Sequence, residues 1–318
     1  MKKERRTLKN GLVVEISHGK VRDIVDAGKV MAAICSNRIS SFEEILPREI
    51  RFKGAVLNIM SAKSMMETVD IVDNCYISMP HPRVSLWVKT EPFKVEFIVR
   101  ARLTGGSWRL YKEGGRKICD VELPDGMVEN QEFPTPIFTP TTKESSKGKH
   151  DENITKNEII FLGLMTDEEY EFVKEKSLAV FARGQEIARL LGLILVDTKY
   201  EFGEDLKGKI RLIDEVHTPD SSRYFYLEGF EEKFAKGESP KQLSKEFVRE
   251  WLMERGFKGN PGEKVPEMTD EFCDKVTDRY IELFKIKGND INILPKNDDD
   301  SNLWELTEDA IIKYVSEN

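Results

Sequence analysis

The pattern of apolar and polar residues divides the chain into a first part that is mostly extended and a longer second part of mixed elements. Residues 12–35 hold two β-rich runs, and the Asp-Ala-Gly sequence at residues 26–28 between them is typical of a hairpin turn. Residues 53–69 have helix-forming residues with apolar positions at helical spacing. We therefore expect residues 1–91 to form a smaller β-rich lobe with one helix packed on its sheet.

The second part, residues 92–318, combines strand-like and helical patterns, so we expect a larger α+β lobe and a two-lobed α+β fold overall. Three helices are predicted in it, at residues 167–191, at about 240–252 and at 270–284. Residues 109–152 are rich in Gly, Pro and Thr and too long for a simple connection, which predicts a functional or disordered loop. Lys143 and Asp151 place an ammonium and a carboxylate in that loop, but composition alone does not show whether these groups have a function.

Residues 194–223 concentrate acidic side chains in two apolar strand-like runs joined by a Gly-containing turn. Alternate residues of a strand share a face, so Asp197, Lys199 and Glu201 are expected to point the same way. If the two runs pair, Glu201 approaches Asp214, and two such charges about 4 Å apart repel by roughly 4 kcal/mol at an effective dielectric near 20. A divalent cation would reverse that repulsion, and Mg²⁺ suits carboxylates that share it with water and phosphate. A solvated hairpin with its acids in water is the alternative.

The composition narrows the classes of partner. The 318 residues include 49 Lys and Arg against 57 Asp and Glu, a net charge of -8 without a basic tract, which argues against a primary role on nucleic acid or an anionic membrane. The four Cys are scattered without a Cys-x-x-Cys pair, and no apolar run is long enough to span a membrane, so a cytoplasmic protein with reduced thiols is expected. The four His lack the spacing of a zinc site. Whether the chain forms a homo-oligomer is left open by the sequence.

Two short segments that combine Gly with cations are candidates for binding phosphate. Gly19 lets the backbone approach a ligand that Lys20 and Arg22 can face, but the full P-loop pattern is missing and a charged surface strand is the alternative. Arg100 precedes a Thr-Gly-Gly-Ser turn at residues 104–107, which offers amides and a hydroxyl to an anion. A plain hairpin with an exposed arginine is equally compatible with that second segment.

A third candidate, the Pro-Asp-Ser-Ser-Arg sequence at residues 219–223, follows the acidic hairpin directly. The forked guanidinium of Arg223 together with the hydroxyls of Ser221 and Ser222 suits a phosphate monoester. The alternative is a helix N-terminus capped by Asp220 or by Ser221, and the two interpretations are compatible.

Several blocks of the chain, taken together and in their order, resemble the SAICAR synthetase family (phosphoribosylaminoimidazole-succinocarboxamide synthases). The resemblance covers residues 19 to 251 or so. The blocks are GKVRDIV at 19–25, SNRISSFE at 36–43, KGAVLN at 53–58, FIVRARLTGGSW at 97–108, TPTTK at 139–143 with KHDE at 149–152, LILVDTKYEFG at 193–203 and DEVHTPDSSRYF at 214–225.

The resemblance implies a two-lobed fold with the ATP site between the lobes, and a soluble ligase of purine biosynthesis. Such a ligase joins L-aspartate to the carboxylate of the purine intermediate CAIR and consumes ATP with Mg²⁺. A carboxylate resists attack by an amine until it is activated, most simply as an acyl phosphate, and enzymes promote that phosphoryl transfer by positioning and charge stabilisation. The alternatives are a paralogous ligase for a related heterocyclic acid or another amine, and a non-catalytic nucleotide-binding protein.

The resemblance also assigns expected roles to individual residues. ATP contacts are expected from Gly19, Lys20, Val21, Arg22, Lys89, Glu91 and Glu201, and Mg²⁺ contacts from Glu201 and Asp214. The catalytic group is expected to comprise Lys199, Asp197 and Lys143. Substrate contacts are expected from Arg100, Ser107, Asp151, Asp220, Ser221, Ser222 and Arg223, with Ser222 and Arg223 at the 5′-phosphate.

The chain departs from the family pattern at three places, all outside the acidic hairpin. Asn37 and Glu43 stand where the family usually has Asp, in SDRISAFD. Gly106 and Ser107 displace the hydroxyl of the usual Thr-Gly-Ser order by one position, and residues 63–66 replace aromatic residues. Since a one-residue shift redirects a side chain, these departures bear on ribotide or aspartate recognition.

Overall fold

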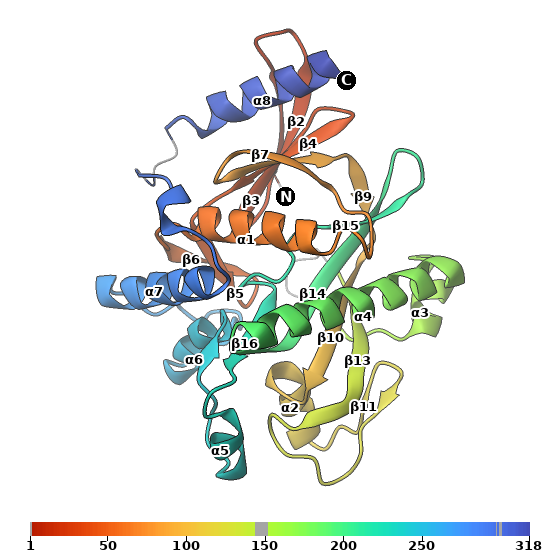
Figure 1. The fold of residues 1–318 in the computed structure, drawn as a ribbon, viewed down its shortest axis with the longest axis vertical. Helices are drawn as coiled ribbons and strands as arrows, with labels where there is room; N and C mark the ends of the chain where they lie inside the picture. Colours follow the sequence, from red (N-terminus) through yellow and green to blue (C-terminus); the bar gives the residue numbers. More distant parts are fainter. Residues whose placement is uncertain (1, 144–151, 297, 299–300) are drawn as a thin grey trace.

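Two antiparallel β-sheets and the helices packed against them make up the computed structural model, which describes residues 2–143, 152–296, 298 and 301–318 (Figure 1). The mixed α+β class predicted from the sequence is confirmed. Among the described residues, none of the helices is both long enough and apolar enough to cross a membrane.

The first sheet comes entirely from the first ninety residues and has six strands in the order β1-β2-β3-β4-β8-β7. The Asp-Ala-Gly turn at residues 26–28 joins β3 to β4, as the sequence predicted. The strands are β1 (Lys2–Thr7), β2 (Val13–His18), β3 (Arg22–Asp26), β4 (Val30–Cys35), β7 (Tyr76–His81) and β8 (Val84–Val88).

The second sheet is built around its longest strand, β14, which pairs with four neighbours. The first half of β14 pairs with β10 and β16, and its second half pairs with β15 and β9. The strands are β9 (Thr90–Pro92), β10 (Val95–Arg102), β13 (Glu132–Thr142), β14 (Leu193–Asp205), β15 (Ile210–Ile213), β16 (Ser222–Tyr226) and β17 (Gln242–Leu243).

Besides these strands, the described residues form two small hairpins, one short 3-10 helix and eight α-helices. The hairpins are β5 (Arg38–Ser41) with β6 (Glu44–Glu49) and β11 (Lys117–Ile118) with β12 (Val121–Glu122). The helices are α1 (Lys53–Glu67), α2 (Gly105–Lys112), α3 (Lys156–Phe161), α4 (Asp167–Leu190), α5 (Phe230–Ala235), α6 (Glu246–Glu254), α7 (Asp270–Ile286), η1 (Ile291–Ile293) and α8 (Leu303–Glu317).

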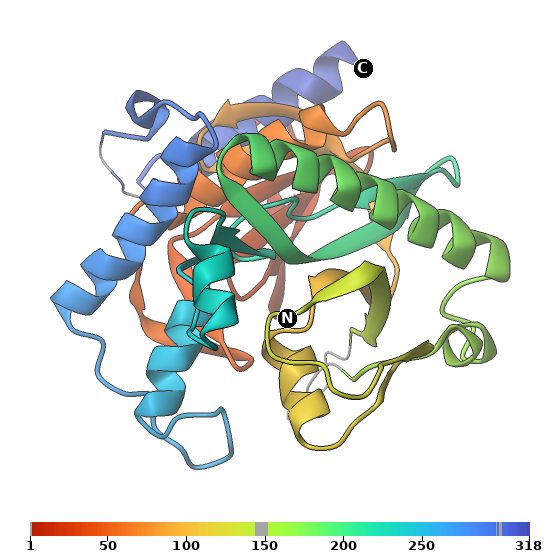
Figure 2. The same cartoon turned by 60° about the horizontal axis from the view of Figure 1, so that its bottom comes forward.

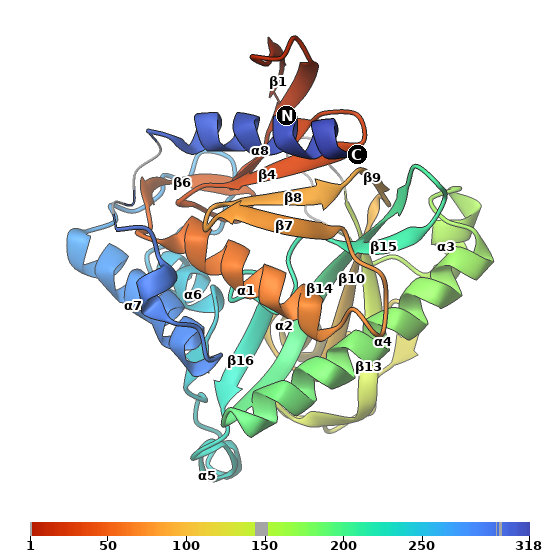
Figure 3. The ribbon, with the colours of Figure 1, turned by 45° about the horizontal axis from the view of Figure 1, so that its top comes forward.

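Helices α1 and α8 cover opposite faces of the first sheet (Figure 3). On β4, Ala32 packs in the cluster that contains Ile311 of α8, whereas Ala33 packs in the cluster that contains the core residues of α1. This is the alternation expected of a strand buried on both faces. The C-terminal helix is therefore attached to the sheet of residues 2–88. The lobe boundary between residues 91 and 92 remains a prediction.

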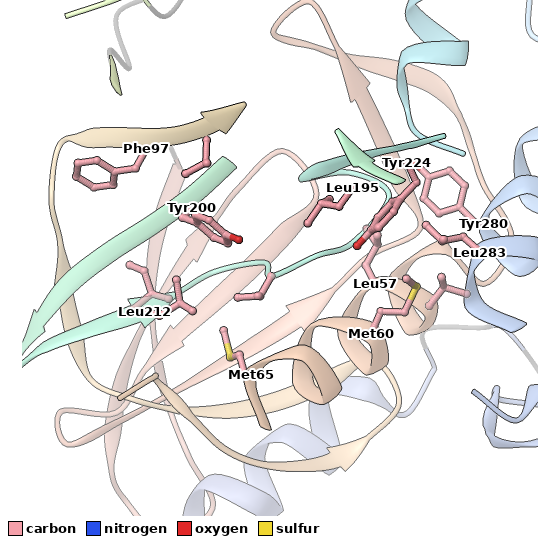
Figure 4. Close-up of a cluster of buried hydrophobic side chains, with 14 of the residues drawn as sticks. Leu57, Met60, Met65, Phe97, Leu195, Tyr200, Leu212, Tyr224, Tyr280 and Leu283 are labelled. Carbon is pink, nitrogen blue, oxygen red and sulfur yellow. The ribbon is translucent and has the colours of Figure 1, made fainter. Parts of the chain in front are cut away.

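The main core runs continuously from α1 to the second sheet and to α7 (Figure 4). Met60 of α1, Tyr200 of β14 and Leu283 of α7 are buried in it. Because one apolar cluster joins these elements, the face of β14 that carries Tyr200 is fixed in the core. Its opposite face, with Asp197, Lys199 and Glu201, is thereby directed away from this core.

The predicted long helix is confirmed as α4, which crosses the second sheet (Figure 2). Its N-terminus has the capping box that Thr166 and Glu169 form with the first turn, and acidic residues occupy that turn. The helix begins at Asp167 and ends at Leu190; Leu191 is its C-cap, and Gly192, in the left-handed region, follows directly.

The prediction that residues 109–152 form an irregular loop was wrong for residues 132–142, which form β13. Three prolines, Pro134, Pro136 and Pro140, suggested a loop, because proline cannot donate to a strand ladder. In the structure β13 lies at the edge of the second sheet and pairs only with β10 along the sheet order, so its outer side needs no donors there. Tertiary structure decides whether a strand lies at the edge of a sheet, and the number of prolines in a segment does not predict it.

Lys287, directly after α7, is buried against α1 with its Nζ 3.3 Å from Ser64 Oγ. Burial lowers the pKa of Lys287 from an ordinary value of 10.5 to about 8, and Glu67 only partly opposes that effect. Between about pH 8 and 10.5 the unfolded chain then binds the proton that the folded chain has released, so this group makes stability rise with pH across that window.

We predict two effects of Lys287→Met. It raises the free energy of unfolding at pH 7 by up to about 3 kcal/mol, and it removes the increase of stability with pH between about pH 8 and 10.5. Denaturant unfolding from pH 7 to 10 measures both effects. Lys285→Met, at an exposed position on the last turn of α7, is the control and should keep the wild-type slope. An unchanged slope in Lys287→Met would show that Lys287 is charged in the folded protein throughout.

Candidate functional site

Strand β14 carries a row of charged side chains on one face. Asp197 lies directly opposite Arg100 of β10 on one side and Arg223 of β16 on the other. Its carboxylate accepts from Arg223 at 2.6 Å and from Arg100 at 3.5 Å. Lys199 and Glu201 follow at the same spacing of two residues, as the sequence predicted. The strand thus presents an arginine-rich end and a lysine-glutamate end.

At the lysine-glutamate end, Glu201 is 7% exposed and accepts from two lysines. Lys199 Nζ donates to Glu201 at 2.9 Å and to Glu96 of β10 at 2.7 Å, and Lys143 also donates to Glu201. Burial alone would raise the pKa of Glu201, but Lys199 and Lys143 outweigh it and hold that pKa far below its ordinary value. Glu201 is therefore a carboxylate throughout the physiological range.

Asp214 lies just past the end of β15, in the left-handed backbone region at φ +65°. Arg22 of β3 donates to Asp214 and to Glu215. The pKa of Asp214 is nevertheless raised, first by burial, which Arg22 opposes, and also by the charge of Glu201. Besides many apolar side chains, the small cavity beside this group is lined by Arg22, Asn58, Ser61, Asp214 and Glu215.

The hairpin predicted within residues 194–223 is confirmed, but Asp214, expected on the returning strand, lies just past its end, and the register differs from the expected pairing. Glu201 faces Ile213, so Asp214 is displaced by one residue from the directly opposed position. The acids are also balanced by Lys143 and Arg22, which come from other parts of the chain, and by Lys199 of the same strand. The repulsion therefore does not by itself require a metal, and the Mg²⁺ site stays a prediction. In the part of the chain that the structure describes, no three His, Cys, Asp or Glu side chains gather as a metal site.

At the arginine-rich end, Arg223 bridges two buried carboxylates. Its second Nη donates to Glu246 of α6 at 3.1 Å, and Arg109 of α2 reaches the same glutamate at 3.4 Å. Burial would raise the pKa of Glu246, but Arg223 and the neighbouring arginines outweigh it and lower that pKa. The first residue of α2, Gly105, lies so close that a Cβ there would be 2.5 Å from an Arg223 Nη. This end therefore gathers guanidinium groups at a helix start.

The structure separates the side chains of Ser222 and Arg223, which are expected at one phosphate. Ser222 faces Thr198 on the other side of the strand, with the two hydroxyl oxygens 2.7 Å apart, and it is 5% exposed. Ser221 Oγ accepts from Thr218 N at 3.2 Å, which closes the turn before β16. Consecutive strand residues point to opposite faces, so only Arg223 joins the arginine-rich end.

Asp220 belongs to a separate buried cluster beneath this turn. Lys53 Nζ lies 2.9 Å and Lys245 Nζ 3.3 Å from its carboxylate, and Tyr280 donates to it. Burial would raise the pKa of Asp220, but Lys245 and Lys53 hold it far below its ordinary value. Lys53 is fully buried at the first residue of α1. The cluster joins α1, α6 and α7 to the residues that precede Arg223.

The segment Gly19–Arg22 forms the turn between β2 and β3, where Gly19 N donates to Arg22 O at 2.8 Å. A Cβ at Gly19 would lie 2.5 Å from that carbonyl oxygen, which explains why glycine occupies this position. Lys20 is half exposed and paired with Glu43, whereas Arg22 is buried with Asp214. The turn therefore connects the first sheet to the acidic pair of the second.

Four predicted residues lie apart from these groups. Lys89 pairs with Asp26, and Glu91 lies in β9 opposite Glu204 of β14. Ser107 is buried and donates to the Thr104 carbonyl at 2.7 Å, so its hydroxyl caps α2. Asp151 lies outside the described residues.

Several side chains of the site were missed in the sequence, among them Glu96, Lys53 and Glu246. Glu96 shares a face of β10 with Arg100, four residues later, so period-two spacing could have indicated it. Lys53, the first residue of the KGAVLN block, and Glu246 lie at helix starts, and only the packing of α1 and α6 brings them to the site.

The chain is similar to known proteins in both sequence and fold. The family model of SAICAR synthetase matches residues 15–264. A phosphoribosylaminoimidazole-succinocarboxamide synthase of Bacteroides thetaiotaomicron is 52% identical over 303 residues, which cover 95% of each chain. A synthase of the same name from Flavobacterium psychrophilum is 43% identical over 94% of each chain.

Two solved structures share the fold. The SAICAR synthase of Saccharomyces cerevisiae, solved in complex with SAICAR, superposes with a TM-score of 0.70 at 30% identity and covers 88% of this chain and 96% of its own. A SAICAR synthetase in complex with ADP superposes with a TM-score of 0.66 at 20% identity, over 89% of this chain and all of its own, which supports the fold alone.

We predict that Gly105→Ala lowers the free energy of unfolding by about 1–3 kcal/mol and displaces Arg223 from Asp197, because Gly105 has φ +56° and its Cβ would meet the guanidinium. Denaturant unfolding and a crystal structure of the variant check the two effects. The neighbouring Gly106→Ala is the matched control, since its Cβ would meet only the Arg109 side chain at 3.8 Å and alanine favours a helix. Equal stability of both variants would contradict the close approach.

Proposed function

Because this chain belongs to the SAICAR synthetase family, as its sequence blocks predicted, it is a ligase of purine biosynthesis, and we propose that it uses ATP and Mg²⁺ to join L-aspartate to CAIR along the charged face of β14. We assign the site to this face because its charged side chains form two separate groups. Guanidinium groups surround Asp197, and ammonium groups surround Glu201, four residues further on. At about 3.3 Å per residue the two ends are roughly 13 Å apart.

The arginine-rich end suits the 5′-phosphate of the ribotide. Arg223 and Arg100 provide fixed donors, and the start of α2 provides backbone N–H groups and the positive end of a helix dipole. Asp197 and Glu246 hold Arg223 in place before any ligand arrives, which reduces the ordering cost of binding. Asp220 and the Ser221 turn support this end from below through Lys53 and Lys245.

The lysine-glutamate end suits the phosphoryl transfer. A carboxylate oxygen of CAIR attacks the γ-phosphorus of ATP, the bond to the bridging oxygen breaks, and ADP leaves. The amine of aspartate then attacks the acyl carbon, loses a proton and expels phosphate. Lys199 and Lys143 place two ammonium groups where negative charge is transferred, so they would stabilise it by fixed electrostatics.

ATP would reach this end from the first sheet. Lys20 is half exposed at the turn between β2 and β3, and the Gly19 backbone allows close approach of phosphate. Lys89 and Glu91 lie at the connection into the second sheet, where backbone groups would bind the adenine. Arg22 would respond to bound phosphates because it contacts Asp214.

The two acidic residues at this end fit Mg²⁺. The ion usually takes one or two carboxylates and fills its remaining positions with water and phosphate oxygens. Glu201 and Asp214 come from neighbouring segments, and their charges interact, since Glu201 raises the pKa of Asp214. When bound, Mg²⁺ would neutralise charge on the ATP phosphates.

Turnover of purified protein with ATP, Mg²⁺, L-aspartate and CAIR tests the proposed function. We expect ADP release to require both CAIR and aspartate. Release that requires a different heterocyclic acid or amine would support the paralogous ligase, for which the departures at Asn37, Glu43 and Ser107 are the motive. ATP binding without any turnover would overturn the enzymatic role of the site.

We predict that Glu201→Gln and Asp214→Asn each lower kcat at least about 100-fold at fixed Mg²⁺, because each removes one of two carboxylates for the ion. Steady-state assays across a Mg²⁺ titration measure the effect, and thermal unfolding measures the accompanying change in stability. Glu204→Gln, on the opposite face of the same strand, is the control. Normal activity of either acidic variant at ordinary Mg²⁺ would remove that residue from the proposed metal site.

A further inference from the structure

A carboxylate from the C-terminal part of the chain is inserted at the start of α1. Asp298 lies on the connection between α7, which packs on α1, and α8, which covers the opposite face of the first sheet. Its Oδ2 accepts from Asn37 Nδ2 at 2.9 Å and from the backbone N–H of Phe52. The contact spans 261 residues of sequence between Asn37 and Asp298.

The Asp298 side chain is 6% exposed, so its charge is costly unless neighbouring groups stabilise it. Arg83 is almost fully buried and has its Nη1 3.8 Å from the other carboxylate oxygen. Phe52, the N-cap of α1, has a left-handed backbone at φ +62°, which is unusual for a bulky residue and persists only where surrounding contacts fix it. The Asp298 contact is one of these.

The two polar atoms of the Asn37 side chain and its backbone carbonyl are all engaged in this arrangement. Its Oδ1 accepts from Gly54 N at 3.0 Å, and its backbone carbonyl accepts from Ile50 N at 2.9 Å. With Nδ2 bound to Asp298, the side chain ties the start of α1 to the C-terminal segment. At this position the family usually has Asp, and a second carboxylate facing Asp298 would be repelled.

The segment around Asn37 in turn holds the turn between β2 and β3. Ser36 donates to the Val21 carbonyl from both its N–H, at 3.0 Å, and its hydroxyl, at 2.8 Å. Arg38 donates to the carbonyls of Lys20 at 2.9 Å and Gly19 at 3.2 Å. Asp298 is therefore connected to residues 19–21 by a hydrogen bond to Asn37, by the backbone of residues 36–38, and by the hydrogen bonds of Ser36 and Arg38.

We propose that Asp298 is a positioning residue that fixes the turn of residues 19–22 through Asn37, so that the C-terminal segment sets the affinity for ATP. The inference rests on the proposed role of that turn in binding the ATP phosphates. Asn37 and Asp298 form a matched pair in which the carboxylate is supplied from the far end of the chain.

Exchanging the side chains of Asn37 and Asp298 tests the contact between them. Asn37→Asp alone opposes two carboxylates, so we expect a fall in melting temperature of about 2–4 °C and about tenfold weaker binding of a non-hydrolysable ATP analogue. Adding Asp298→Asn re-forms the amide-carboxylate pair in reverse and should restore both values to within about twofold in affinity and 1 °C. A double variant no better than Asn37→Asp overturns the pairing.

Asp298→Ala with hydrogen exchange tests the path to the turn. We expect faster exchange of the Ser36, Phe52 and Gly54 amides and about tenfold weaker binding of the analogue. Asp278→Asn, at an exposed position on α7, is the control and should change neither. Wild-type exchange rates would overturn the contact, and faster exchange with unchanged affinity would overturn the coupling to ATP. Neither measurement uses CAIR or aspartate, so a wrong acid substrate in the proposed function would show only in the turnover assay.

Discussion

The structure depends on the compensation of poorly exposed carboxylates by neighbouring cations. Burial of an isolated charge is so unfavourable that it persists only with close partners. Glu201 on β14 is balanced by Lys143 and by Lys199 of the same strand, and Asp214 is balanced by Arg22 of the first sheet. The Arg22 contact ties the two sheets together at the same place where the chemistry is proposed.

The two acids of that site have opposite electrostatic environments. Glu201 faces two ammonium groups and its pKa is lowered, whereas Asp214 shares Arg22 with Glu215 and its pKa is raised. A ligand that brings both phosphate and Mg²⁺ changes the charge seen by the lysines and by the acids together. In the proposed reaction the same residues would stabilise the free protein and also serve the chemistry, because their partners would be exchanged when substrates bind.

Sequence patterns predicted most of the elements near the site. Helical spacing located α1, α4 and α7, and the period-two pattern placed Asp197, Lys199 and Glu201 on one face. The prolines of β13 misled the prediction, since an edge strand tolerates them. The one-residue offset of Asp214 was also missed, because register depends on the turn and on the packing of both strands.

By itself, the sequence determined the α+β class, the family and the charged face of β14, because these follow from local periodicity and from contiguous motifs. Tertiary structure alone decided that Lys143 and Arg22 neutralise the acids and that Lys53, Glu246 and Asp298 reach the site or its supports. Each of these contacts joins residues that are distant in sequence or depends on strand register. Local patterns contain no information on such distances, which are set by the packing of helices and sheets around a common core.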